Sequence, residues 1–227
     1  MQVDTTSWEA QLAAFKETLA WSSSRLDMVV PSAGVSGVLG KEYFTNLTPT
    51  DDPPKPSTIA LDVNLTGVYY TALLAIHYFN ARVTDESFKP QLCFISSLAG
   101  YGDLPFSADY SATKWGVRGI WRSLRGPRGV NSLGGIQANL IAPTFLRTAM
   151  TASFVEQLEQ AGAKVGEVGD AVEGVLRAVA DDEVDGEFVR ALYRTSWCIV
   201  SVLTSVGIDR QGDCRVIWPR RAWLDES

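Results

Sequence analysis

Two side chains in the segment 95–116 have the types and the spacing needed for proton transfer. Tyr110 and Lys114 stand four residues apart in a stretch with helical periodicity, so both project from one face of the predicted helix. A phenol ionises at a pH near 10 and is a poor base at neutral pH, but a nearby ammonium favours the phenolate. The pair therefore predicts a general acid/base, in which Tyr110 moves the proton and Lys114 lowers the pKa of the phenol.

A hydroxyl group suited to orienting a substrate precedes this pair. Ser97 lies thirteen residues before Tyr110, directly after the apolar run 91–96, which is predicted to be a strand. Ligands of open α/β sheets bind beyond the carboxyl ends of the strands, and a serine hydroxyl both donates and accepts hydrogen bonds. Ser97 is therefore the candidate for holding a carbonyl or carbinol oxygen.

Other residues of reactive type have simpler interpretations. His77 is the one histidine and lies late in an apolar helix with no acid close by in the sequence, which favours a core position. The three cysteines lack metal-type spacing, so no metal site is predicted. Asn64 is either a functional amide or a buried amide with satisfied hydrogen bonds. A core or subunit-interface position is more typical than a substrate pocket for Tyr69, Tyr70, Trp115 and Trp121.

Helical and strand-like segments alternate along the chain. This pattern predicts the α/β class, with a parallel sheet covered by helices on both faces. Thr6 and Glu9 indicate a capping box at the start of the first helix. Predicted helices cover 7–21, 57–81, 108–125 and, in two pieces split near 162–169, 151–180; predicted strands cover 26–30, 91–96 and 136–142. These three strands should be neighbours, and their carboxyl ends should then bring Ser32, Ser97 and Thr144 to one edge of the sheet.

The composition limits the classes of partner. A chain of 227 residues with 46% hydrophobic content predicts one domain over 1–227. The net charge of −6 argues against nucleic-acid binding, which requires clustered Lys and Arg. We expect no membrane partner, because no window is judged to reach the ~18 apolar residues of a membrane span. An odd number of cysteines argues against a disulfide framework and favours a reducing, cytoplasmic location.

Several motifs, in matching order, resemble those of the short-chain dehydrogenase/reductase family. Ser97, followed thirteen residues later by Tyr110-Ser-Ala-Thr-Lys114, resembles the active site of that family. The Asn-Ala-Gly turn, the Asn-Val-x-Gly helix motif and the Pro-Gly segment of the family have counterparts at 32–34, 63–67 and 143–148. The resemblance covers residues 1 to about 190 and implies a Rossmann-like parallel sheet.

The resemblance implies a role for each matching residue. Tyr110 would be the acid/base, Lys114 its electrostatic partner and a ribose ligand, and Ser97 the hydroxyl that orients the substrate. Asn64 would anchor a water molecule in a proton relay, and Asp4 would meet the adenine. NAD or NADP is the implied cofactor, and the other residues that would line its site are Ser32, Ala33, Gly34, Leu146 and Thr148.

The sequence departs from the family pattern in several places. The family begins with a strand, a T-G-x-x-x-G-x-G turn and a helix that hold the cofactor pyrophosphate. Val3 and Asp4 match the end of its third strand, so its first two strands and first helix are expected to be missing and cofactor binding to be weakened. Ser32 replaces Asn and Thr144 replaces Gly, and a β-branched residue adopts positive φ poorly. About residues 190–211 are predicted to be an insertion.

Two hypotheses for function follow. The first is an enzyme, an NAD(P)-dependent oxidoreductase that interconverts a secondary alcohol and a ketone of a small organic molecule. The second is a degenerate family member without redox turnover, which binds a small molecule or catalyses cofactor-free isomerisation, dehydration or cyclisation. In the family, the helices that carry Asn64 and Tyr110 form the usual subunit interface, so a homodimer or homotetramer is expected.

Overall fold

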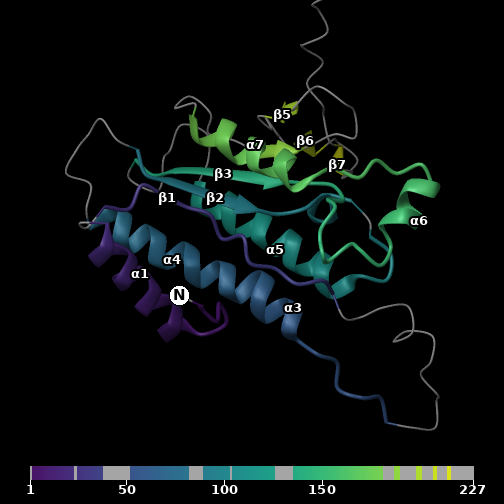
Figure 1. Ribbon diagram of the computed structural model, residues 1–227, viewed down its shortest axis with the longest axis horizontal. Helices are drawn as coiled ribbons and strands as arrows, with labels where there is room; N and C mark the ends of the chain where they lie inside the picture. The colour runs from purple at the N-terminus through teal and green to yellow at the C-terminus, as the bar shows by residue number, and fades with distance from the viewer. Residues whose placement is uncertain are drawn as a thin grey trace, which may run out of the picture.

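A mainly parallel β-sheet forms the centre of the computed structural model (Figure 1). The structure describes residues 2–22, 25–37, 52–81, 89–102, 104–125 and 135–180, and four short strands that follow. The sheet has the order β1-β2-β3-β4-β5, in which the first four strands are parallel and the fifth is antiparallel. Its strands are β1 (Met28–Val29), β2 (Gln91–Ile95), β3 (Gln137–Ala142), β4 (Glu187–Val189) and β5 (Cys198–Val200). The predicted class and the neighbouring positions of the first three strands are confirmed.

Helices cover both faces of this sheet (Figure 1). On one face lie α1 (Trp8–Trp21), α4 (Val68–Asn80) and α5 (Ala108–Arg125), whereas α7 (Val168–Ala180) lies on the other. The described residues also form shorter helices: α3 (Ile59–Leu61), the π-helix η1 (Asp62–Gly67), the 3-10 helix η2 (Leu98–Gly100) and α6 (Val155–Gln160). The predicted helix over 108–125 is confirmed, as is the division of 151–180 into two helices.

The first helix begins one residue later than the sequence pattern indicates. Ser7 is its N-cap, with extended backbone and a hydroxyl that accepts a hydrogen bond from the backbone N–H of Ala10 at 3.1 Å. Thr6 instead donates its hydroxyl hydrogen to the carboxylate of Asp4 at 2.8 Å. The prediction of Thr6 as the capping residue was therefore wrong, because Asp4 holds its side chain in the preceding turn.

The main hydrophobic core lies between the sheet and helices α4 and α5. Its largest fully buried side chains include Phe79 from α4, Phe94 and Leu92 from β2, and Leu140 from β3. Trp121 of α5 is also buried here, and its indole N–H donates to the carbonyl oxygen of Ala138 at 2.9 Å. Burial of each such side chain contributes roughly 1.5–3 kcal/mol to stability, so this layer fixes α5 against the sheet.

The helical stretch Ile59–Asn80 corrects one sequence expectation. Its 22 residues are long and apolar enough for a membrane span by length and composition alone, whereas no such window was expected. Val68, Ala72, Ala75 and Phe79 of this stretch belong to the main core. A helix that fills the space between a sheet and two other helices needs apolar residues over most of its surface, which accounts for this composition.

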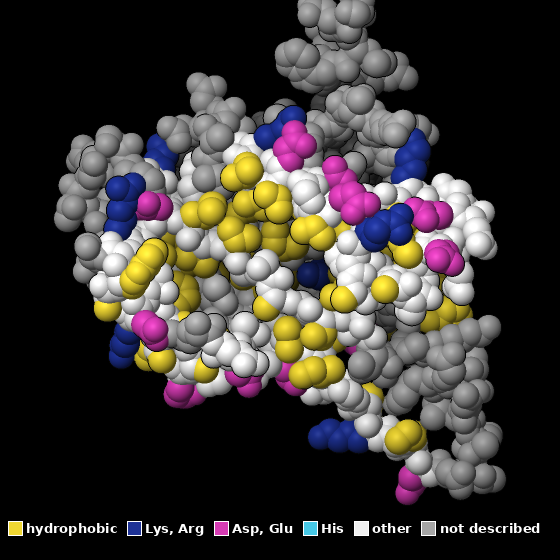
Figure 2. Space-filling view, in the orientation of Figure 1, with side chains coloured by type: hydrophobic (Ala, Val, Ile, Leu, Met, Phe, Trp, Pro, Cys, Tyr) yellow, Lys and Arg dark blue, Asp and Glu magenta, His cyan; other side chains and the backbone are white. Residues whose placement is uncertain are grey.

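Helix α7 carries an apolar stripe on its outer side. Val168, Val172 and Leu176 follow one another at four-residue spacing and are each about half exposed. Figure 2 shows hydrophobic side chains gathered over this helix. The inner side of α7 packs against β2 and β3 through Ala178, so the helix is apolar on more than one side.

The last parallel strand begins at Glu187, which pairs with Leu140 of β3. The predicted insertion at about 190–211 contains β5 and β6 (Gly207–Ile208), and β6 pairs with β7 (Cys214–Arg215) in a separate ladder. The other residues of that segment lie outside the described residues, as do 38–51 of the predicted surface loop. The insertion therefore stays a prediction.

Candidate active site

The carboxyl ends of β1, β2 and β3 meet at one edge of the sheet. Ser97 follows β2, and the next residue ties this segment to β3, since the N–H of Leu98 donates to the carbonyl oxygen of Pro143 at 3.0 Å. Ser32 follows β1 in the same way. Ser32 and Ser97 therefore lie at the sheet edge that the sequence predicted for them.

Tyr110 lies in the first turn of α5 and is partly buried. Burial raises the pKa of its phenol, and a hydrogen bond with the Ser97 side chain opposes this rise by lowering the pKa. The Ser97 hydroxyl also accepts from the N–H of Ala99 at 3.2 Å, which fixes its position at the start of η2. The predicted pair of Ser97 and Tyr110 is thus brought together, with the Ser97 hydroxyl held by its own backbone.

Lys114 is buried one helical turn after Tyr110. Its Nζ atom lies 5.5 Å from the centroid of the Tyr110 ring and donates to the carbonyl oxygen of Ile95 at 3.2 Å. Burial lowers the pKa of this ammonium to about 8. In this structure the pKa of Tyr110 is raised, and burial is the largest cause. The lowering expected from Lys114 together with a bound nicotinamide cation stays a prediction.

Ser96 and Ser97 have different roles. The hydroxyl of Ser96 is buried and donates to the backbone carbonyl oxygen of Lys114 at 3.0 Å. This bond joins the end of β2 to the middle of α5, so that Ser96 positions Lys114 while Ser97 faces Tyr110.

The buried lysine leads to a prediction for stability against pH. The pKa of Lys114 is about 8 in the folded protein and is 10.5 in its ordinary state. Between these values the unfolded chain binds more protons, so the contribution of Lys114 to the free energy of unfolding should rise with pH from about 8 to 10.5, by up to about 3 kcal/mol. Urea unfolding of the wild type and Lys114→Met across this range measures it. A difference between the two proteins that stays constant from pH 7 to 10.5 would contradict the assignment.

Asn64 lies within the π-helix η1 and is fully buried. Its Oδ1 atom accepts from the N–H of Val35 at 2.8 Å, and its Nδ2 atom donates to the carbonyl oxygen of the same residue at 2.8 Å. Of the two interpretations open at the sequence level, the geometry of the side chain is that of a satisfied buried amide. It braces the segment after β1, where Gly34 lies beside it: a Cβ atom at Gly34 would be in van der Waals contact with Oδ1, at 3.4 Å. The proton-relay role stays a prediction.

The residues expected to meet the cofactor lie in three places. Ser32, Ala33 and Gly34 are exposed after β1. Asp4 is exposed before α1, and its carboxylate accepts from the N–H of Thr6 at 2.9 Å as well as from the hydroxyl, which lowers the pKa of Asp4. Its carboxylate is therefore engaged in a local turn.

The third group follows β3. Leu146 forms a parallel bridge with Gly166, and the N–H of Thr148 donates to the hydroxyl of Thr151 at 3.1 Å. Arg147 lies between them and forms ion pairs with Glu159 at 2.6 Å and Glu167 at 3.2 Å. These contacts close the segment 146–167 on itself beside the sheet edge.

Thr144 does not strain the backbone. Among the described residues, Phe106 is the one non-glycine residue with positive φ, at 57°. Thr144 is a described residue and so has negative φ, which a β-branched side chain adopts readily. This position therefore does not require positive φ in this chain.

The remaining reactive side chains have structural surroundings. In the described part of the chain, no group of three or more His, Cys, Asp or Glu side chains is placed to hold a metal ion. Cys93 is buried in β2, and burial raises the pKa of its thiol to about 12. His77 lies in the last turn of α4 against the ring of Tyr78, at 4.9 Å between centroids.

Sequence comparison agrees with this geometry. The protein-family model described as "short chain dehydrogenase" matches residues 1–159 of this chain. The chain belongs to the short chain dehydrogenase family. Its relatives include NADP-dependent dehydrogenase clz5 of Cochliobolus lunatus, 43% identical over 196 residues, which cover 81% of this chain and 68% of that protein. NADP-dependent dehydrogenase M3 of Phoma sp. is 43% identical over 197 residues, 82% of this chain and 58% of that protein.

A third relative is the 5'-hydroxyaverantin dehydrogenase of Dothistroma septosporum, 37% identical over 174 residues, which cover 73% of this chain and 56% of that protein. This chain thus spans between about half and two thirds of the length of these three relatives. Together with the family match, they place the chain among oxidoreductases of the short-chain type.

Solved structures show the same fold at low identity. A 3-oxoacyl-[acyl-carrier protein] reductase from Brucella melitensis in complex with NAD has a TM-score of 0.66 at 21% identity, and the match covers 83% of this chain and 74% of that one. ElxO with NADP bound has a TM-score of 0.64 at 22% identity, covering 85% and 75%. The Rossmann-like α/β fold is therefore established.

Proposed function

We propose that this chain carries the catalytic residues of an NAD(P)-dependent oxidoreductase that interconverts a secondary alcohol and a ketone of a small organic molecule. The observation that carries the proposal is the cluster at the sheet edge. There, the side chain of Ser97 hydrogen-bonds to Tyr110, and the ammonium of Lys114 lies 5.5 Å from the Tyr110 ring. These are the groups needed to hold a carbonyl oxygen and to give it a proton.

Each residue of the cluster has a separate task. The Ser97 hydroxyl orients the substrate oxygen beside the phenol. Tyr110, whose raised pKa keeps it protonated near neutral pH, donates its proton to that oxygen during reduction. Lys114 then stabilises the phenolate through its positive charge, which a pKa of about 8 leaves largely in place at pH 7. When bound, NAD(P)H would supply the hydride for the substrate carbon.

The residues at this edge fit a nicotinamide nucleotide. Ser32, Ala33 and Gly34 expose backbone and small side chains beside the carboxyl end of β1, where such ligands approach closely. One N–H of the Lys114 ammonium goes to Ile95, and an ammonium has three, so ribose hydroxyls would find donors there. We favour NADP over NAD, because two relatives at 43% identity are named NADP-dependent dehydrogenases.

Cofactor affinity of these 227 residues alone is proposed to be weak. The printed sequence contains no T-G-x-x-x-G-x-G turn, which in this family surrounds the pyrophosphate with backbone N–H groups. Within the described residues, β1 is the outermost strand on its side of the sheet. A strand bearing that turn would find unpaired backbone groups at this edge.

Calorimetric titration of the purified protein with NADPH and NADH tests both parts of this proposal. We expect weak binding of NADPH, with a dissociation constant of about 0.1–1 mM rather than micromolar. Without the Gly-rich turn, the pyrophosphate lacks several charge-assisted hydrogen bonds from backbone N–H groups. At saturating NADPH, a panel of ketones should be reduced, and Ser97→Ala should lower the rate. Absence of reduction at saturating cofactor would instead favour the degenerate, non-redox member of the family.

We also propose a homodimer or homotetramer with a small-molecule substrate, located in the cytoplasm and without nucleic-acid or membrane partners. Support for the subunit interface comes from the packing of η1 and α4 against α5, with Gly116 of α5 so close to Leu65 that a Cβ atom would overlap its side chain. The two helices expected at the interface therefore form one continuous surface. Sedimentation velocity measures the oligomeric state directly.

A further inference from the structure

Asp109 is a buried acidic side chain directly before the proposed acid/base. In the part of the chain that the structure describes, two charged side chains are buried, Lys114 at 7% exposed and Asp109 at 6%. Burying a charge is costly unless polar groups surround it, so a carboxylate is expected in such a place only where it has partners. Lys114 belongs to the proton-transfer cluster, whereas Asp109 lies outside it, and its burial needs another reason.

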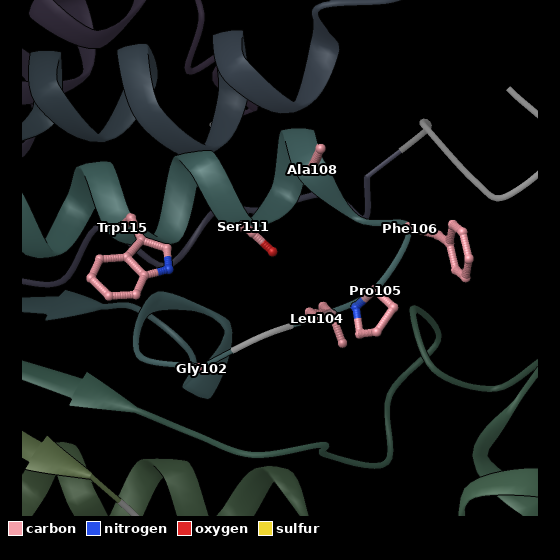
Figure 3. Close-up of a pocket in the computed structure, with 7 residues that line it drawn as sticks. All are labelled: Gly102, Leu104, Pro105, Phe106, Ala108, Ser111 and Trp115. Atoms are coloured by element: carbon pink, nitrogen blue, oxygen red, sulfur yellow. The ribbon is translucent and has the colours of Figure 1, made fainter. Parts of the chain in front are cut away.

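The carboxylate of Asp109 is bonded to the backbone of Tyr110 itself. Its Oδ1 atom accepts from the N–H of Tyr110 at 2.8 Å. The N–H groups in the first turn of a helix have no partner within the helix, and α5 begins at Ala108, so this bond satisfies one of them. Ala108 and Ser111 line the open pocket that Figure 3 shows, whereas Asp109, about 100° further round the helix from Ala108, is buried on another side. The carboxylate therefore acts from the interior on the backbone that carries the phenol.

The carboxylate also contacts the segment after β1. A Cβ atom at Gly37 would overlap it, and the three atoms nearest to that Cβ would be Cγ, Oδ1 and Oδ2 of Asp109. Backbone and carboxylate meet here because glycine has no side chain. Any other residue at position 37 would have to displace either the carboxylate or the segment.

Asn64 holds the same segment at its other end. The Asn64 amide bonds to both the N–H and the carbonyl oxygen of Val35, at 2.8 Å each, two residues before Gly37. Asn64 is fully buried in η1, and η1 packs against α5. The segment 35–37 thus lies between two buried polar side chains, the amide of Asn64 and the carboxylate of Asp109. The residues proposed to meet the cofactor, 32–34, directly precede it.

We propose that Asp109 is a positioning residue: its carboxylate holds the first turn of α5 against the segment after β1 and so sets the place of the Tyr110 phenol beside Ser97. The inference rests on the proposed function, in which Tyr110 gives its proton to a substrate oxygen that Ser97 orients. Proton transfer requires the two oxygens within hydrogen-bond reach, and a displacement of about 1 Å can lower a rate by about 10²-fold. The task requires an acceptor oxygen at this place, which the isosteric amide of asparagine also supplies.

Steady-state kinetics of ketone reduction at saturating NADPH tests this task. Asp109→Ala should lower kcat by about 10–100-fold and leave the KM for the ketone within about threefold, because a contribution to the transition state is lost. Asp109→Asn keeps the acceptor and should stay within about threefold of the wild type in both constants. Glu9→Ala, which removes an exposed acidic side chain from the first turn of α1, is the control and should leave both unchanged. Equal losses in the alanine and asparagine variants of Asp109 would refute the proposal, because charge and not position would then be responsible.

The contact with Gly37 allows a test by compensation. Gly37→Ala should lower kcat by about 10–100-fold in the wild type, because the new methyl group displaces the carboxylate. Asp109→Ala removes the three atoms nearest to that methyl group, so in this background Gly37→Ala should change kcat by less than about threefold. The same loss in both backgrounds would show that Gly37 acts independently of Asp109 and would overturn the proposal.

Fluorine NMR of 3-fluorotyrosine placed at position 110 follows the phenol without cofactor or substrate. Its signal should shift in Asp109→Ala and in Gly37→Ala and keep its position in Asp109→Asn and Glu9→Ala, while urea unfolding verifies that each sample is folded. A signal that does not move in Asp109→Ala would contradict the proposal, whether or not the protein reduces a ketone. A signal that moves as expected in a protein that reduces no ketone would support the positioning of Tyr110 and contradict the proposed function alone.

Discussion

Tyr110→Phe is expected to lower turnover by about 10²–10⁴-fold, because it removes the hydroxyl that donates the proton to the substrate oxygen. The ring and its packing beside Lys114 are retained, so the free energy of unfolding should change by less than about 1 kcal/mol. The rate is measured as NADPH oxidation with a ketone at saturating cofactor, and stability as urea unfolding of the same preparations.

Tyr101→Phe is the matched control for this variant. The hydroxyl of Tyr101 is buried and has no hydrogen-bond partner among the described residues. Its ring is covered by Arg118, a contact that phenylalanine keeps. Turnover should therefore be unchanged and stability unchanged or slightly raised. Equal loss of turnover in both variants would remove Tyr110 from the mechanism, since the effect would then come from general disturbance of this region.

The sequence located the site well where its signals are local. Helical spacing places Tyr110 and Lys114 on one face of a helix, and the strand that ends at Ile95 places Ser97 beside them. Neither inference needs knowledge of distant residues. The order of β1, β2 and β3 could also be predicted, because parallel strands joined by helices are usually neighbours.

Properties that depend on the surroundings of a residue could not be predicted in this way. The rise in the pKa of Tyr110 results from burial, which depends on side chains from other elements. The bonds between Asn64 and Val35 join residues 29 positions apart through a π-helical turn that no periodicity reveals. Every residue carries a backbone carbonyl oxygen, so the sequence does not indicate that the one of Ile95 accepts the hydrogen bond from Lys114.

The two tryptophans of α5 show the same limit for aromatic residues. The sequence analysis favoured a core or interface position for Trp115 and Trp121 alike. Trp121 is 3% exposed and lies in the main core, whereas Trp115 is 49% exposed in the single chain, so it is not a core residue and its interface position stays a prediction. They stand six residues apart on one helix, which places them about 120° from each other around its axis, so only the position of the sheet decides which one is buried.

Gly100→Ala is expected to disturb the site more broadly than any change to a catalytic side chain. A Cβ atom at Gly100 would lie 2.8 Å from the backbone carbonyl oxygen of Lys114 and 2.7 Å from the hydroxyl oxygen of Ser96. The first of these is a backbone atom, so η2 and α5 would have to move apart. We expect a loss of about 1–3 kcal/mol in the free energy of unfolding.

Because Ser97 lies on one side of that contact and Lys114 on the other, the same movement should lower turnover by about 10²-fold. Gly119→Ala is the control: it lies on the exposed side of α5 with no atom within 4 Å of a Cβ, and should stabilise the helix by roughly 0.5–1 kcal/mol without affecting turnover. If Gly100→Ala kept full turnover and stability, η2 and α5 could not be packed as closely as described, and the positions of Ser97 and Lys114 relative to each other would not depend on that contact.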